Sequence, residues 1–189
     1  LLERARVTLH DETGWTLSTT HAAARLMALL RAAAQGGGRD DVLDWLKAEA
    51  GDGPALAALE SQWRRGGDVD DSAARLWQRS LESLQGLRGR GRRTLAAWLA
   101  ALQAAAPGLL RALADDAAGR QLLGVLHLEG LPAGAAWLAA AEATSFDLAD
   151  FTAWVDATLE ATSFVPPAQP QASVLITPLE RALLRPFAA

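Results

Sequence analysis

The segment SVLITPLERALLRPF, residues 173–187, decides how the fold of this chain is read. Its β-branched and aliphatic run, Val174–Ile176, stands between a proline-rich approach and the pair Thr177-Pro178, which predicts a buried strand that runs into a turn. A lone strand cannot satisfy its own backbone donors and acceptors, so it must pair with a sheet that the other residues barely supply. We therefore expect the chain to be cut from a larger protein.

Nearly everything before this strand has the pattern of short amphipathic helices. Leucines and tryptophans recur at helical spacing, and glycines or prolines separate one run from the next. The residues that precede or open these runs are typical helix N-caps and first-turn residues: Ser18, Thr19, Thr20, Asp40, Asp41, Pro54, Asp70, Asp71, Ser72, Thr94, Pro107, Asp115 and Asp116. The sequence thus predicts a mainly α, multi-helix bundle of at least seven helices, with at most a small β element near the C-terminus.

Composition restricts the classes of function. Half of the 189 residues are hydrophobic, which is enough to bury a core, and the absence of cysteine excludes disulfides and cysteine-bound zinc and fits a cytoplasmic protein. The net charge of −4 argues against a stand-alone, non-specific DNA-binding protein. The best candidate for a membrane span, residues 94–114, is interrupted by Gln103, Pro107 and Arg111, so we expect no membrane partner.

The residue types that carry chemistry are not arranged as a site. His10, His21 and His127 lie far apart and lack partners at helical spacing, so we expect no metal site. The chain has no phosphate-binding Gly-Lys-Ser/Thr loop, no Gly-x-Ser-x-Gly elbow and no His-Glu-x-x-His motif. We therefore expect no catalytic residues in it, and neither ATP hydrolysis nor DNA cleavage by the chain alone.

Two features raise the question of nucleic-acid binding. Six tryptophans fall on apolar helix stripes, where core packing explains them better than base stacking, whereas Trp15 lies in a polar loop. The other feature is the arginine segment, residues 88–93, which contains Arg88, Arg90, Arg92 and Arg93 among glycines. This segment is either an adaptable contact for an anion or a solvated loop.

Three stretches resemble one family. They are DETGWTLSTT, residues 11–20; DDVLDWLK, residues 40–47; and residues 151–164 taken together with VLITPLERALLRPF, residues 174–187. They are similar to the helicase-like subunits of bacterial RecBCD/AddAB-type ATP-dependent helicase–exonucleases. These subunits are related to the UvrD/Rep helicases of superfamily 1, and the resemblance is to those that also carry a PD-(D/E)XK nuclease domain.

The resemblance implies a division of the chain. Residues 1–51 correspond to the start of the second motor lobe, called 2A, residues 52–172 to its helical insertion, called 2B, and residues 173–189 to the strand and turn that return to 2A. Thr177 matches the threonine that follows the returning strand in the family. The histidine and the Lys-Gly-Leu-Glu that come next in working motors are absent.

The resemblance also implies a function. The chain would be a DNA-handling part of a helicase–exonuclease subunit in double-strand break repair and recombination, positioning DNA without performing chemistry. Contacts with DNA would come from Arg88, Arg90, Arg92, Arg93, Thr177 and Arg181. The fragment itself would bind no cofactor; ATP and Mg²⁺ would bind elsewhere in the parent protein, which would work with a partner helicase or nuclease subunit.

One alternative of a different class stays open. Short Ala/Leu-rich helices and an acidic net charge equally suit a helical protein–protein interaction module, such as an α-solenoid adaptor. A solenoid, however, has no use for a buried strand followed by Thr-Pro.

Overall fold

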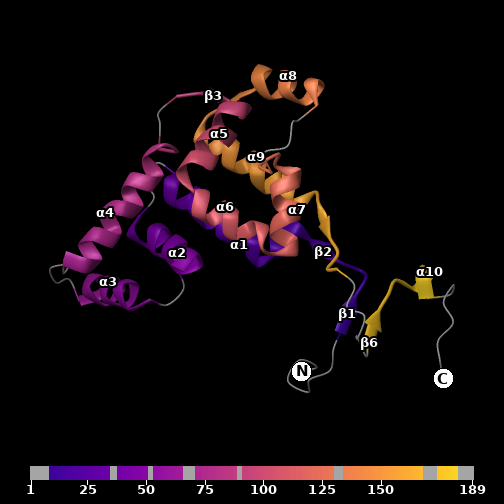
Figure 1. Ribbon diagram of the computed structural model, residues 1–189, viewed down its shortest axis with the longest axis horizontal. Helices are drawn as coiled ribbons and strands as arrows, with labels where there is room; N and C mark the ends of the chain where they lie inside the picture. Colours follow the sequence, from indigo (N-terminus) through magenta and orange to yellow (C-terminus); the bar gives the residue numbers. More distant parts are fainter. Residues whose placement is uncertain are drawn as a thin grey trace.

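The computed structural model describes residues 9–34, 38–50, 53–65, 71–88, 91–129, 134–167 and 174–182, and these residues form the mainly α fold that the sequence predicts. Figure 1 shows a helical body from which a small two-stranded ribbon projects. The helices are α1 (His21–Ala33), α2 (Arg39–Ala50), α3 (Pro54–Arg65), α4 (Asp71–Gln85), α5 (Leu95–Ala105), α6 (Pro107–Ala114), α7 (Ala117–Val125), α8 (Ala135–Ala143), α9 (Leu148–Glu160) and the short α10 (Leu179–Ala182), with a 3₁₀ turn, η1 (Leu17–Thr19), before α1.

Most helices begin where the sequence predicts. The side chains of Thr20, Thr94, Asp116 and Asp147 each accept a hydrogen bond from the backbone N–H three residues later, which satisfies one of the free donors at a helix start. The expectation for α2 needs a correction, because the helix already begins at Arg39 and its two aspartates lie inside the first turn. There Asp41 accepts the N–H of Gly38 at 2.9 Å, so it reaches back to the residue before the helix instead of capping it from outside.

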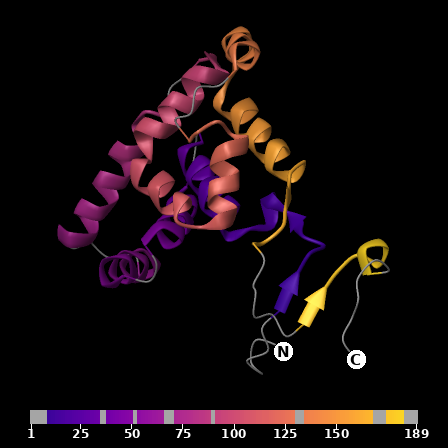
Figure 2. The same cartoon turned by 45° about the vertical axis from the view of Figure 1, so that its right-hand side comes forward.

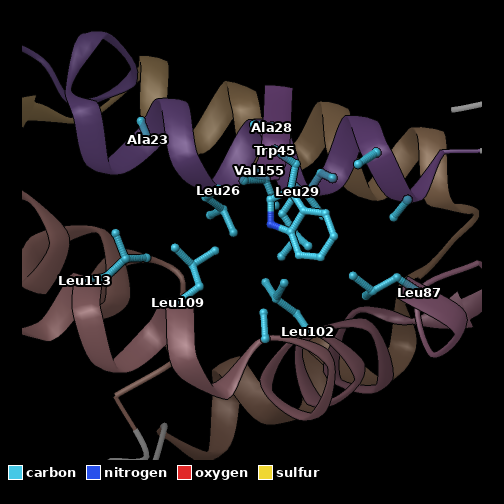
Figure 3. Packing of buried hydrophobic residues seen from close by; sticks show 14 of the residues in the cluster. Ala23, Leu26, Ala28, Leu29, Trp45, Leu87, Leu102, Leu109, Leu113 and Val155 are labelled. Atoms are coloured by element: carbon cyan, nitrogen blue, oxygen red, sulfur yellow. The ribbon is translucent and has the colours of Figure 1, made fainter. Parts of the chain in front are cut away.

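Helix α1 lies at the centre of the hydrophobic core. Its side chains Leu26, Leu29 and Leu30 are fully buried, and so are most of its alanines. It packs against α2, α4, α7 and α9, elements that come from the whole length of the body. Figure 3 shows Leu26 facing Leu109 of α6 across the core.

The predicted division of the chain at residues 51 and 52 does not coincide with a break in this packing. Buried residues of α1 and α2, on one side of the division, belong to the same core as those of α3 to α9 on the other side. The domain boundary therefore stays a prediction.

The tryptophans predicted to lie in the core divide into two groups. Trp45 and Trp98 are buried, and the indole of Trp98 donates a hydrogen bond to the carbonyl of Phe146 at 2.9 Å. The other four, Trp63, Trp77, Trp137 and Trp154, pack against the core but stay partly exposed. Core packing thus fully accounts for only two of the six tryptophans that were predicted to lie in the core.

Within the described ranges, three two-stranded ladders join segments that are distant in sequence. Strands β1 (Leu9–Asp11) and β6 (Val174–Ile176) pair in parallel, β2 (Trp15–Thr16) pairs antiparallel with β5 (Ser163–Phe164), and β3 (Arg93–Thr94) pairs antiparallel with β4 (Ser145–Phe146). The sequence analysis predicted only β6. It was also wrong to predict that β6 is buried, because Val174, Leu175 and Ile176 are 36%, 36% and 40% exposed. Among the described residues β1 is the only partner of β6, and the ladder stands apart from the helical body in both views (Figures 1 and 2).

A tight joint connects the ribbon to the body. Gly14 precedes β2 with a φ of +69°, and a Cβ atom there would lie 2.6 Å from the carbonyl oxygen of Phe164. Only glycine fits a left-handed conformation at such close approach to a neighbouring backbone. Trp15, which is 42% exposed, packs edge-on against the Phe164 ring at 5.7 Å, so the joint is both close-packed and partly open to solvent.

None of the described helices is by itself long and apolar enough to cross a membrane. Helices α5 and α6 meet the requirement of length and composition only as a pair, and they meet at a bend of 89°.

The packing of α7 on α6 makes a prediction about two glycines of the same helix. A Cβ at Gly119 would lie 2.0 Å from the carbonyl oxygen of Leu113, whereas at Gly124 the nearest atom is Oε1 of the flexible Glu129 side chain, at 3.2 Å. We expect Gly119→Ala to lower the free energy of unfolding by roughly 2–3 kcal/mol or more, because α7 must move away from α6. Gly124→Ala should raise or lower it by no more than about 1 kcal/mol. Urea unfolding followed by circular dichroism measures both, and equal effects would contradict this packing.

Candidate nucleic-acid interface

The arginine segment, residues 88–93, connects the end of α4 to strand β3. Arg88 follows α4, Arg92 precedes β3, and Arg93 is the first residue of that strand. Arg90 lies outside the described residues. Three of the four predicted DNA contacts in this segment can therefore be examined.

Arg88 links α4 to the centre of the fold. Its half-buried guanidinium donates from Nη2 to the carbonyl of Ala32 in the last turn of α1, at 3.0 Å. A cation at the C-terminus of a helix interacts favourably with the free carbonyls and the helix dipole. Arg88 thus holds two helices together and presents little of its charge to solvent.

Arg92 links β3 to strand β4 and helix α9. Its Nη1 forms an ion pair with Oδ2 of Asp150 at 3.1 Å, and its Nη2 donates to the carbonyl of Ser145. The Arg92 and Asp150 side chains are 58% and 47% exposed, so the ion pair itself contributes at most about 1 kcal/mol.

Arg93 lies over the face of the buried Trp98. Its Cζ is 4.7 Å from the centre of the ring, and its Nη1 donates to the carbonyl of Gly86 at 2.9 Å. The cation–π contact and the hydrogen bond together fix the end of α4 against α5. Arg93 is therefore half-buried and structural in this conformation.

The sequence could not reveal these roles. The partners of Arg88 and Arg92 lie between 53 and 58 residues away along the chain, so no local pattern marks them. The two interpretations from sequence were an anion contact and a solvated loop. The described arginines also connect elements of the fold, and Arg92 is the most exposed of them, so the anion contact stays a prediction.

The second predicted site is the turn after β6. Thr177 donates its hydroxyl to Oε2 of Glu12 at 2.8 Å, and the N–H of Glu12 donates to the carbonyl of Ile176 at 2.8 Å. Thr177 thus closes the β1–β6 ladder at its end. Arg181 lies in α10, and its side chain is outside the described part of the structure.

The structure does not bring the two predicted sites together. Strand β3, next to the arginine segment, lies in the upper part of the body, whereas β6 lies in the ribbon at the opposite end (Figures 1 and 2). Any DNA that contacts both must extend along the molecule.

A charged hollow that the sequence analysis missed lies between α2 and α3. It has a volume of about 350 Å³ and is lined by three cations, Arg39, Lys47 and Arg64, three carboxylates, Asp40, Asp44 and Glu60, and the side chains of Leu43 and Trp63. The hydrogen bond from Lys47 to Glu60, aided by the charges of Arg64 and Lys47, lowers the pKa of Glu60 below its usual value against the opposing effect of desolvation. The three positive charges of the hollow are balanced by its three carboxylates, so the hollow does not favour a phosphate.

Within the described ranges, no group of three or more histidine, aspartate or glutamate side chains is close enough together to hold a metal ion. Comparison with protein-family models, with curated proteins and with solved structures finds no match to the chain.

The position of Arg93 makes a prediction about stability. We expect Arg93→Ala to lower the free energy of unfolding by about 1–2 kcal/mol, because it removes both the contact with Trp98 and the hydrogen bond to Gly86. The matched control is Arg75→Ala, which removes the same charge from the exposed face of α4 and should change stability by less than about 0.5 kcal/mol. Thermal or urea unfolding compares them. An Arg93→Ala variant as stable as the control would mean that the arginine is a solvated loop residue.

Proposed function

We propose that this chain is a DNA-handling part of an ATP-dependent helicase–exonuclease subunit that acts in double-strand break repair and recombination. In this proposal the helical body corresponds to the 2B insertion of a UvrD/Rep-like second motor lobe, and it positions DNA without performing chemistry. ATP and Mg²⁺ would bind the rest of the parent protein, which would work in the cytoplasm with a partner helicase or nuclease subunit.

The observation that carries the proposal is the parallel pairing of β1 with β6. Leu9 is the register partner of Val174, and Asp11 that of Ile176, so two adjacent parallel strands are joined by a connection that contains the whole helical body. A parallel pair always requires a crossover, which is usually a single helix. Here the crossover is an entire domain, which is the arrangement expected of an insertion into a sheet.

The side chains of β6 also fit the inside of a larger sheet. Successive residues of a strand point to opposite faces, so exposed Val174, Leu175 and Ile176 make both faces of β6 apolar. Parallel sheets normally have both faces covered. The α/β lobe of a helicase motor would supply such a cover.

The joint formed by Gly14 and the β2–β5 ladder also supports the proposal that the helical body is an inserted domain. Strands β2 and β5 pair directly beside the ribbon, so the chain enters and leaves the helical body through one narrow connection. An inserted domain has its two ends close together for the same reason.

The contacts of α1 argue against the solenoid alternative. In a solenoid each repeat contacts only its neighbours along the chain. Helix α1 instead contacts α7 and α9, which follow it by most of the length of the body. A bundle built around one early helix suits an inserted domain better than a stack of repeats.

The proposal is tested in the full-length parent by the salt dependence of DNA binding. Replacing Arg90, Arg92 and Arg93 by alanine should flatten the slope of log affinity against log salt. The expected change in slope is about 0.9 for each phosphate that the variant no longer neutralises on duplex DNA, or about 0.7 on single strands. Thr177→Ala should weaken binding with little change in slope, because a hydroxyl carries no charge.

The control for this experiment is Arg75→Ala, which removes one positive charge from α4 outside the predicted contacts. It should leave the slope within about 0.2 of the wild-type value, since phosphate contacts alone set the slope. Unchanged affinity and slope in the triple variant would contradict the predicted contact and favour the protein-interaction alternative.

A further inference from the structure

A second hollow, which we call the aromatic hollow, lies between α3 and α4 on the side of the helical body away from the ribbon (Figure 1). It has a volume of about 240 Å³, and three helices line it: α2 with Arg39, α3 with Leu59 and Trp63, and α4 with Ala74, Trp77 and Gln78. None of the predicted DNA contacts belongs to this lining. The aromatic hollow does include two of the four tryptophans whose partial exposure core packing leaves unexplained.

The rings of Trp63 and Trp77 meet at a right angle in this hollow. Their centroids are 4.7 Å apart, and their planes are at 90° to each other. A flat ring that stacks on one of them therefore meets the other edge-on, and both arrangements are favourable between aromatic rings. Because both tryptophans line the hollow and keep part of their surface exposed, they form an open corner that suits a planar aromatic group.

Two polar side chains stand at the same corner. The Cζ atom of Arg39 lies 5.4 Å from the centre of the Trp63 ring, and the exposed Arg39 side chain forms no hydrogen bond or ion pair with another described residue. A guanidinium held only by a ring can turn to the face or the edge of a bound base. Gln78 is exposed on α4, and its amide both donates and accepts hydrogen bonds. These groups suit the polar edge of a nucleobase better than they suit an aliphatic side chain.

The neighbouring charged hollow limits what phosphates contribute. The two hollows share Arg39 and Trp63. In the charged hollow Glu60 is paired with two cations, whereas the carboxylates of Asp40 and Asp44 are exposed. These two carboxylates repel a phosphate that approaches Arg39. The bases, and not the phosphates, are therefore the part of a nucleic acid that this corner can hold.

We propose that the aromatic hollow holds one base of a single DNA strand. The base stacks on the indole of Trp63 or Trp77 and meets the other indole edge-on, and Arg39 contacts its remaining face or its edge. Stacking of this kind accepts any sequence, because every base has a π face. Bases inside a duplex are stacked and paired, and removing one from the stack costs free energy, so the site selects single strands. The inference rests on the proposed function and deepens it by naming the part of DNA that the helical body holds.

The test compares two oligonucleotides of equal length, one of thymidine and one that is abasic and so has the same phosphates without bases. Their affinities for the intact chain are measured by the fluorescence anisotropy of an attached dye. We expect the thymidine oligonucleotide to bind about tenfold more tightly, which is the order of the effect of one base stacked on an aromatic side chain. The ratio of the two affinities should change little with salt, because both probes carry the same charge.

Variants of the corner should remove this preference for bases. We expect Trp63→Leu and Trp77→Leu each to reduce the ratio of affinities to less than about twofold. The matched control is Trp154→Leu, which removes a partly exposed tryptophan that lines neither hollow and should leave the ratio unchanged. Because the loss of Trp63 or Trp77 also removes packing against the core, Ala74→Leu is the second variant. It keeps both tryptophans and fills the hollow from α4, so it should reduce the ratio equally while circular dichroism shows a folded chain.

Equal affinities of the two oligonucleotides for the unmodified chain would overturn the proposal and would leave the aromatic hollow to a side chain of a protein partner. A ratio that persists in Ala74→Leu, or that falls as far in Trp154→Leu, would also overturn it. These outcomes are distinct from those of the proposed function. The salt slope of the parent reports the phosphate contacts of the arginine segment, whereas the ratio of affinities reports the bases alone, so either can fail while the other holds.

Discussion

The burial of α1 on several sides is the constraint on which the rest of the helical body depends. Burying a leucine side chain contributes roughly 1.5–3 kcal/mol, and α1 buries Leu26, Leu29 and Leu30 completely. The alanines between them are small enough for α2, α4, α7 and α9 to approach closely. Arg88 adds a polar link by donating to the last turn of α1 from the end of α4. Helices too short to be stable alone are thus held by one shared partner.

The packing around α1 also determines where the chain enters and leaves the helical body. Because η1 and α1 pack against α9, the chain leaves the body next to the point where it entered, and the β2–β5 ladder fixes that exit. Beyond the Gly14 joint, β1 and β6 then lie side by side and pair in parallel. The proposed role as an insertion into a motor lobe depends on this closure more than on any single side chain.

The sequence was sufficient to predict what is set locally. Thr20, Thr94 and Asp116 were recognisable as helix starts because a cap acts on a backbone group three residues away. Strands of two residues, such as Arg93–Thr94, carry no periodic pattern, and they exist only because a distant partner satisfies their backbone. The prediction that β6 is buried was wrong because burial, too, depends on distant partners. The apolar residues of β6 suit burial, but within the described chain β6 pairs only with β1.

The candidate sites also depend on contacts between residues that are distant in sequence. The arginines of residues 88–93 were visible as a concentration of charge, yet their partners at Ala32, Ser145 and Asp150 are defined only by tertiary packing. The charged hollow between α2 and α3 carried no sequence signal either, because its lining residues come from two helices that only the fold brings together.

The central claim, that the helical body is inserted between two adjacent parallel strands, is tested most directly by disulfide formation between introduced cysteines. The chain has no cysteine of its own, so Leu9→Cys with Val174→Cys gives a single pair at partner positions of the ladder. Neighbouring strands lie about 4.8 Å apart, within the range that a disulfide spans. The account predicts rapid intramolecular crosslinking of this pair under mild oxidation. It predicts little for Leu9→Cys with Leu175→Cys, because position 175 is one residue out of register with position 9 and successive positions of a strand face opposite sides of a ladder. Equal crosslinking of the two pairs, or none in the first, would contradict the parallel register and with it the insertion.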